Sequence, residues 1–341
     1  MVKIAIAGAS TLLGKELNEL LADSPLAASK FVLLDDDKAQ GQLDQVGDEI
    51  TFVQSISADA FEGADFTFFC GTQAQTLAHW TDALRAGSSV IDLTGALDSQ
   101  PGVLVRSPWL VSQTVSPDLL TAAVVPADPA ALALAMLTER AQQVGPVRLA
   151  SATVLYPASE FGRAAMDELH HQTISLLSFQ SLPREQYDAQ VAFNLLGALG
   201  ESAKTNLTQV AARTRRHYAA LSAGRLPALT LQALHAPVFH GLAFSVLVEL
   251  ERPVELSILE DAFSGDRIDL VLEDTDSPSN LATTGHNEIL VRLRPDPGER
   301  NPNLISRFWL WSASDNLRLA AQNAIDCAMD LRRLRPQGKV Q

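Results

Sequence analysis

The sequence predicts an α/β protein in two parts: a doubly wound parallel sheet, then an α+β domain with a mixed or antiparallel sheet. In the first half, short apolar strands alternate with helical stretches, which is typical of a parallel sheet covered on both faces. A glycine-containing turn follows the first strand directly. From about Pro146 the strands cluster and separate from the helices, as in α+β domains. The expected domains are 1–127 plus 313–341, and 128–312.

Each expected element rests on the spacing of apolar residues. Leucines recur at helical spacing over 12–22, and a second helix is expected over 75–85. Short apolar runs predict the first strands, at 2–7, 31–34, 66–70, 90–93 and 122–125. In the second half the expected strands are 147–155, 229–239, 243–251, 268–272, 289–293 and 308–311, and the expected helices are 160–177, 208–221 and 316–334. We expect the last helix to pack back on the first domain.

The composition is that of a soluble globular protein. The 341 residues are 47% hydrophobic and 19% charged, which suits folded domains and argues against disorder. The net charge of −14 and the pI of about 4.9 would repel a nucleic acid or an anionic membrane surface. We therefore expect neither nucleic acid nor membrane partners.

Cysteine and histidine usage favours a cytoplasmic protein without a metal site. Cys70 and Cys327 lie far apart in the sequence and have no partner at metal-ligand spacing. The histidines form no HExxH pair. The first ten residues, MVKIAIAGAS, lack the apolar core of a signal peptide. The apolar run 119–137 is interrupted by Pro126 and Asp128, so it does not predict a membrane span.

The turn GASTLLG, from Gly8 to Gly14, is a candidate phosphate-binding turn. Gly8 permits a tight turn, and the helix that follows offers free N–H groups to a phosphate. Gly14 lets that helix approach the sheet closely. Thr11 stands where a middle glycine is usual. The alternative is a doubly wound domain whose turn binds nothing.

Acidic residues close the second expected strand. Asp35, Asp36 and Asp37 lie about 20 residues beyond the glycine turn, where a carboxylate holds the ribose 2′-hydroxyl of a dinucleotide. Carboxylates there would repel a 2′-phosphate, so NAD is favoured over NADP. Lys38 weakens that preference, and the run also fits a solvated turn.

Six sequence blocks, in order, carry a resemblance to a known family. They are GASTLLG, VIDLTGAL, AVVPADPAAL, QVAFNLL, HAPVFHG and WSASDNLRLAAQNA. Together they span nearly the whole chain, which resembles aspartate-semialdehyde dehydrogenases and most of all their Usg-type homologues. The resemblance implies a Rossmann-like domain with the C-terminal helix returning to it, and a dimerisation domain that makes the protein a homodimer.

The resemblance also implies a dinucleotide site. Gly8, Ser10, Thr11, Leu12 and Gly14 keep the phosphate turn in usable form. Family members have a small loop beside the bound dinucleotide and an asparagine near the nicotinamide. Gly71 and Thr72 match the loop, and Asn316 matches the asparagine. Asn316 also fits a cap of the last helix.

The family's nucleophile is absent from the matching position. Active members use a cysteine thiolate, because a thiolate is nucleophilic near neutral pH and is a competent leaving group. Asp128 occupies that position in the turn PADPA. A carboxylate adduct would be a poor hydride donor. Asp128 followed by Pro129 instead predicts a helix N-cap.

Four further family positions are changed. Leu242 stands at the general-base histidine, and leucine cannot move a proton. His235 stands at the substrate-gripping arginine, Tyr156 at the glutamine that positions the nucleophile, and Asp98 at the phosphate-gripping arginine. His240, expected to share a strand face with Leu242, is a candidate substitute base.

These changes predict a dimeric homologue that is inactive on aspartate semialdehyde and keeps NAD or NADP binding. Two alternatives stay open. One is an NAD(P)-dependent oxidoreductase with a different substrate, acting through His240 or Tyr156. The other is a non-catalytic partner that binds no nucleotide and forms mixed dimers with an active paralogue.

Overall fold

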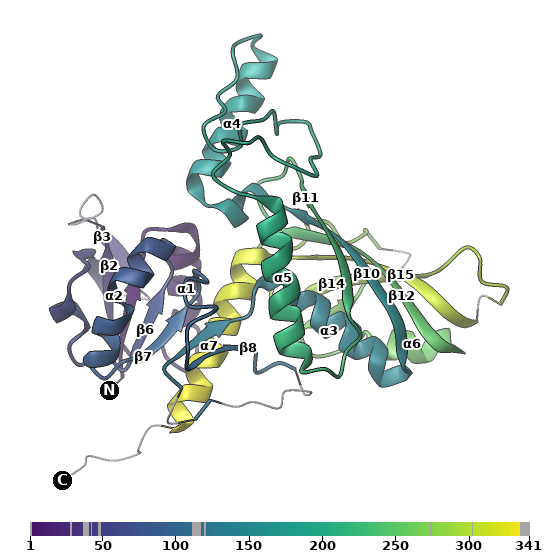
Figure 1. The fold of residues 1–341 in the computed structure, drawn as a ribbon, viewed down its shortest axis with the longest axis horizontal. Helices are drawn as coiled ribbons and strands as arrows, with labels where there is room; N and C mark the ends of the chain where they lie inside the picture. Colours follow the sequence, from purple (N-terminus) through teal and green to yellow (C-terminus); the bar gives the residue numbers. More distant parts are fainter. Residues whose placement is uncertain are drawn as a thin grey trace. The chain divides into compact units, whose positions relative to one another are not determined.

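The computed structural model describes residues 2–27, 29–36, 41, 43–46, 49–110, 117–118, 121–272, 275–301 and 303–334. The chain divides into two compact units (Figure 1), and the division falls within the last helix. The first unit is Met1–Ala127 with Ala320–Gln341, and the second is Asp128–Leu319.

The first unit is built on a seven-stranded sheet in the order β5–β2–β1–β6–β7–β9–β8. All its pairings are parallel, which confirms the predicted sheet. The strands are β1 (Lys3–Ala7), β2 (Lys30–Asp35), β5 (Gln54–Ser55), β6 (Phe66–Phe69), β7 (Ser89–Asp92), β8 (Val103–Arg106) and β9 (Ala123–Pro126). A separate hairpin joins β3 (Leu43–Val46) to β4 (Glu49–Phe52). The sequence did not predict β3, β4, β5 or β8.

Helices cover both faces of this sheet. Ile4 and Ile6 of β1 pack with α1 (Leu12–Ala22) and with α7 (Asn316–Leu334). Ala5 and Ala7, which point the other way, pack with α2 (Gln73–Arg85) and the short helix η1 (Ala58–Phe61). This alternation is the two-residue period of a strand, and it explains why the buried strands read as continuous apolar runs.

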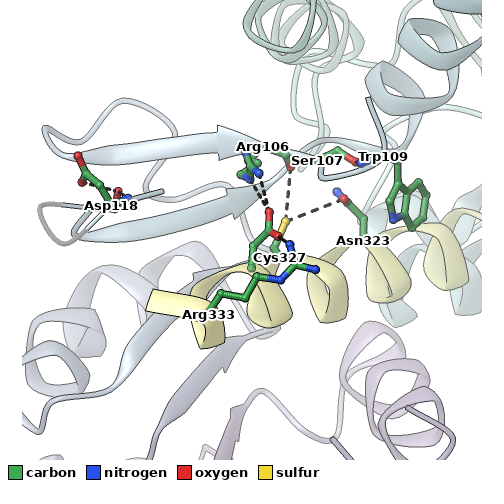
Figure 2. A network of polar contacts seen from close by, with 9 residues as sticks. Arg106, Ser107, Trp109, Asp118, Asn323, Cys327 and Arg333 are labelled. Carbon is green, nitrogen blue, oxygen red and sulfur yellow. Dashed lines mark hydrogen bonds and ion pairs between the residues drawn. The ribbon is translucent and has the colours of Figure 1, made fainter. Parts of the chain in front are cut away.

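Polar contacts fix α7 to the first unit (Figure 2). Arg106 donates from Nε and Nη2 to Asp330 Oδ2 at 3.0 and 2.5 Å. The Trp109 indole N–H donates to Asp326 at 2.6 Å. The Cys327 thiol donates to the Arg106 carbonyl at 3.7 Å. The C-terminal helix therefore packs on the first unit, as expected.

The second unit holds a six-stranded mixed sheet in the order β11–β10–β12–β15–β14–β13. The pairs β10–β11 and β13–β14 are parallel, and the others are antiparallel, which agrees with the predicted mixed sheet. The strands are β10 (Val147–Tyr156), β11 (Leu229–His235), β12 (Leu242–Glu255), β13 (Ile268–Leu270), β14 (Ile289–Pro295) and β15 (Leu304–Ser314).

The helices of the second unit are α3 (Pro129–Val144), α4 (Arg163–Leu177), α5 (Leu207–Ser222) and α6 (Leu256–Ala262). The single helix predicted over 160–177 is wrong at its start. Gly162 has φ +87° and separates the short helix η2 (Ala158–Phe161) from α4. A left-handed residue cannot continue an α-helix, and glycine takes that conformation without strain.

Candidate functional site

Close backbone approach requires glycine in the turn after β1. Gly8 has φ +90°, and a Cβ added there would lie 2.2 Å from the Gly71 nitrogen. A Cβ at Gly14 would lie 2.2 Å from the Gly8 carbonyl oxygen. The structure therefore brings together the two glycine loops that the sequence singled out, at the ends of β1 and β6.

Thr11, which occupies the position of the usual middle glycine, holds the turn together with its side chain. Its hydroxyl donates to the carbonyl oxygens of Gly8 at 2.8 Å and Cys70 at 2.9 Å, and accepts from the Gly14 N–H at 3.0 Å. Thr11 is thus the N-cap of α1. Among the described residues, no partner is found for the N–H groups of Leu12 and Leu13 at the start of this helix. These features fit a phosphate group.

Asp35 is buried and engaged by the turn itself. Its Oδ2 accepts from the Ser10 N–H at 2.8 Å and from the Ser10 hydroxyl, and its Oδ1 accepts from the Asp36 N–H at 2.8 Å. Asp37 and Lys38, which bear on the choice between NAD and NADP, lie outside the described residues. Asp35 therefore braces the turn, whereas Asp36 is exposed.

Thr72 begins α2 with a capping box. Its hydroxyl accepts from the Gln75 N–H at 3.2 Å, and the Thr72 N–H donates to the Gln75 side chain at 2.8 Å. This reciprocal pair satisfies two donors at the helix start. The loop at Gly71 and Thr72 is therefore fixed in shape.

In the second unit, Asp128 is the N-cap of α3, as predicted. Its Oδ1 accepts from the Ala131 N–H at 3.0 Å and from the Thr214 hydroxyl at 3.1 Å. Arg213 Nη1 lies 3.8 Å from Oδ2. The Asp128 N–H donates to His217 Nδ1 at 2.9 Å. Asp128 is only 3% exposed, so its carboxylate is enclosed by its own partners.

Tyr156 joins the same polar cluster. It is fully buried at the end of β10, and its hydroxyl lies 2.8 Å from the Thr214 hydroxyl. Burial, and then the charge of Asp128, raise the pKa of Tyr156 well above its ordinary value. Tyr156 is therefore held as a neutral phenol and is a poor proton acceptor.

Glu160 and Asn316 form a hydrogen-bonded pair within reach of the charge of Asp128. Asn316 Nδ2 donates to Glu160 Oε2 at 3.0 Å, while Asn316 Oδ1 accepts from the Ser159 hydroxyl at 3.1 Å and the Gly241 N–H at 3.3 Å. Burial, and then the charge of Asp128, raise the pKa of Glu160 to about 7. The alternative role of Asn316 as helix cap is wrong, because Asp315 accepts from the N–H groups at the start of α7.

His235 lies at the end of β11, with no exposed surface. Its ring centroid is 4.7 Å from that of Tyr187 and 5.7 Å from that of Phe161. The nearest polar group that acts on the ring is the Ala236 backbone, which opposes the effect of burial on the pKa of His235 without cancelling it. Burial lowers the pKa of His235 to about 4, so the ring is a neutral core group.

The remaining candidate positions have structural surroundings. Leu242 is fully buried as the first residue of β12. The expectation that His240 shares a strand face with Leu242 is wrong, because His240 lies in a bend before β12 begins. Asp98, in the first unit, follows β7 in a turn where its N–H donates to the Gly95 carbonyl at 3.4 Å.

Both cysteines are poor nucleophiles. Cys70 and Cys327 are buried, and burial raises the pKa of each thiol well above its ordinary range. A thiol that stays protonated at neutral pH does not attack carbonyl carbon.

Sequence reasoning missed Arg213, Thr214, His217 and Glu160. The first three come from α5, and Arg213 and His217 are one helical turn apart, a spacing that places them on one face. That spacing was the available signal. In the part of the chain that the structure describes, no group of three or more potential metal ligands occurs, and no helix is long and apolar enough to cross a membrane.

Two family models match the chain. Residues 3–128 match the model described as "Semialdehyde dehydrogenase, NAD binding domain", and residues 140–319 match "Semialdehyde dehydrogenase, dimerisation domain". A Pseudomonas aeruginosa protein named "USG-1 protein homolog" is 28% identical over 332 residues, covering 95% of this chain and 96% of the relative. The aspartate-semialdehyde dehydrogenase of Rickettsia conorii is 24% identical over 344 residues, covering 96% and 97%.

Solved structures agree with the fold. A probable aspartate-semialdehyde dehydrogenase from Pseudomonas aeruginosa superimposes with a TM-score of 0.86 at 27% identity, covering 97% of this chain and 98% of that chain. An aspartate semialdehyde dehydrogenase from Candida albicans, solved with NADP, gives a TM-score of 0.65 at 12% identity, covering 97% and 99%. The second likeness concerns the fold alone.

Proposed function

The chain belongs to the semialdehyde dehydrogenase family, and we propose that it is a dimeric member that no longer turns over aspartate semialdehyde. The observation that carries this proposal is the state of Asp128. The carboxylate is buried, caps α3, and is held by Thr214 and Arg213. It has neither the nucleophilicity of a thiolate nor an open path to a carbonyl carbon.

The other changed positions support the same proposal. Leu242 cannot accept a proton, and Tyr156 and His235 are buried as neutral groups. A buried neutral imidazole cannot grip a carboxylate as an arginine does. Asp98 would repel a phosphate. The loss of one of these groups is compatible with a variant mechanism. The combined loss of the nucleophile, the general base, and the two arginines that bind substrate and phosphate is not.

We further propose that the first unit keeps dinucleotide binding. The N–H groups of Leu12 and Leu13 would hold a phosphate, and the close packing around Gly8, Gly14 and Gly71 shapes the turn that presents them. A bound nicotinamide dinucleotide would supply a hydride acceptor. The carboxylates of Asp35 and Asp36 would repel a 2′-phosphate, which favours NAD over NADP.

Two measurements test these proposals separately. Purified protein is assayed for phosphate-dependent reduction of NAD and of NADP with aspartate semialdehyde, beside a catalytically active family member as positive control. We expect no turnover, and reproducible turnover would overturn the main proposal. Calorimetric titration with NAD and with NADP, on a folded sample, tests the dinucleotide site. We expect saturable binding of NAD, and no heat with either would overturn retained binding.

A different observation keeps one alternative in view. Glu160 is partly exposed and its pKa is raised to about 7, so the second unit retains a group suited to proton transfer. This observation favours an oxidoreductase or related enzyme with another substrate over a site without any acid–base group. Turnover of a small hydroxy compound with NAD, lost in Glu160→Gln, would support this alternative.

A further inference from the structure

The mixed sheet of the second unit has one covered face and one open face. Successive side chains of a strand point to opposite faces. α3 lies against β10 and β12, and α5 lies against β11. The side chains on the covered face are almost completely buried, among them Ala152, Val154, Val246, Val248 and Leu310. The side chains that alternate with them on β10 and β12 are partly exposed.

The strand register shows which outward side chains lie together. Two neighbouring rows cross β10, β12 and β15, and we call them the open sheet face: Thr153–Ser245–Trp311 and Ser151–Leu247–Trp309. Trp309 and Trp311 are 39% and 36% exposed. The open sheet face therefore consists of small or apolar residues and two indole rings, without a charged group.

Both indole N–H groups on this face are satisfied within the chain. Trp309 Nε1 donates to Asp296 Oδ2 at 3.1 Å, and Trp311 Nε1 donates to the Pro278 carbonyl at 2.7 Å. A partner that covers the rings would therefore leave no indole donor unpaired. The rings are held in place and present apolar surface, as aromatic anchors of protein interfaces do.

Charge appears only in the row next to Leu247, where it is balanced. Glu249 Oε1 lies 3.4 Å from Arg148 Nη1, and Glu249 Oε2 accepts from Arg307 Nη2 at 3.1 Å. An uncharged centre beside a charged rim is the usual composition of a protein–protein interface.

We propose that the open sheet face docks on the same face of a second copy of this chain, with Trp309 and Trp311 as anchors. The inference rests on the proposed dimeric function and names the surface that forms the dimer. All six strands lie between residues 147 and 314, within the range that matches the family's dimerisation domain. A two-fold axis places a surface against itself. Two chains of net charge −14 each meet there with the least repulsion, because this face carries no unbalanced acid.

The shape and chemistry of this face favour a second copy over other partners. An extended peptide would add to an edge of the sheet and not to its face. An anionic membrane or a nucleic acid would require a basic surface. A sheet face instead packs on another sheet, about 10 Å away, through interdigitating side chains.

Sedimentation velocity of the full chain over a dilution series tests this inference. We expect a dimeric wild type. Leu247→Arg places a guanidinium without a partner at the centre of the contact, and it should raise the dimer dissociation constant at least about 100-fold. Ile258→Arg is the matched control, because Ile258 is 49% exposed on α6, which packs against α3. The control should leave the dissociation constant unchanged.

The outcomes separate the dimer from the choice of face. A monomeric wild type would overturn the proposed dimer and this inference together. A dimeric wild type whose Leu247→Arg variant stays dimeric would overturn the choice of face alone. Dissociation by Ile258→Arg instead would assign the contact to the helical side of the sheet, against the proposal.

A milder variant tests the anchors and keeps the inference testable if circular dichroism shows that Leu247→Arg does not fold. Trp309→Ala removes a half-exposed ring and no buried charge. It should raise the dissociation constant about 30-fold, as expected for an aromatic residue near the centre of an interface. Ile258→Ala should change nothing. An unchanged dissociation constant in Trp309→Ala would overturn the role of Trp309 as an anchor.

Discussion

The backbone N–H of Asp128 donates to Nδ1 of His217 at 2.9 Å. An imidazole nitrogen that accepts a hydrogen bond carries no proton, so the neutral ring holds its proton on Nε2. The side chain of Asp128 accepts in turn from Ala131 and Thr214. Asp128 is thereby bonded through both its backbone and its carboxylate, and it begins α3.

Replacing Asp128 should therefore cost stability. In Asp128→Ala the cap and the acceptor of Thr214 are lost, and the free energy of unfolding should fall by about 1–2 kcal/mol. Asp128→Asn keeps an acceptor oxygen and should cost less. Urea denaturation measures both. Asp266→Ala, at an exposed aspartate outside any cap, should change stability by less than about 0.5 kcal/mol. Equal effects at the two positions would show that the cap contributes nothing.

His235 should make the protein less stable in mild acid. Burial lowers its pKa in the folded state from 6.5 to about 4. Between these values the unfolded chain binds a proton that the folded chain does not, so the stabilisation present above pH 6.5 declines as the pH falls. The expected loss between pH 7 and pH 5 is at most about 2 kcal/mol.

The variant His235→Phe tests the origin of this pH dependence. Phenylalanine has no titrating group and suits a site between Phe161 and Tyr187. We expect the difference in unfolding free energy between pH 7 and pH 5 to shrink in the variant, as measured by urea denaturation at both pH values. An undiminished difference would assign the effect to other groups.

Two glycines with similar backbone angles should differ in their tolerance of alanine. Gly8 has φ +90° and Gly87 has φ +82°. A Cβ at Gly87 meets nothing within 4 Å, whereas at Gly8 it would lie 2.2 Å from the Gly71 nitrogen. Gly87→Ala should cost about 1–2 kcal/mol from strain alone. Gly8→Ala adds overpacking against backbone and should cost about 2–5 kcal/mol.

Thermal unfolding of both variants measures this difference. If Gly8→Ala folds, calorimetry should also show weaker NAD binding than in Gly87→Ala, because the two glycine loops would be pushed apart. Equal stability of the two variants would show that Gly8 and Gly71 do not approach as closely as the structure indicates.

The central strands and the glycine turn were predictable because their causes are local. Central parallel strands such as β1 and β6 are buried on both faces and read as apolar runs. The edge strand β5 was missed because its two residues, Gln54 and Ser55, are polar, whereas β8 was overlooked although Val103–Val105 form a short apolar run. The Asp128 cap was predictable from Asp-Pro alone.

The polar cluster was only partly predictable because it depends on tertiary contacts. Thr214 and His217 reach Asp128 from a helix far along the chain. Glu160 reads in the sequence as an ordinary helical residue. Its pKa is raised by burial and then by the charge of Asp128, which is distant in sequence. Periodicity places residues on a face, but it does not show which faces meet.

The contact between Arg106 and Asp330 should be the main polar attachment of α7 to the first unit (Figure 2). The two side chains are 9% and 12% exposed. In Arg106→Met the carboxylate of Asp330 would stay largely buried without its principal partner, and the unfolding free energy should fall by about 3 kcal/mol. Arg333 contacts the same carboxylate at 3.1 Å but is 80% exposed, so Arg333→Ala should cost less than about 1 kcal/mol.

Urea denaturation compares the two variants, and hydrogen exchange locates the change. Faster exchange confined to α7 in Arg106→Met is the expected result, because the helix loses its attachment while the sheet keeps its own core. If the arginine variants lost stability equally, the buried geometry of Arg106 would not be what holds the helix.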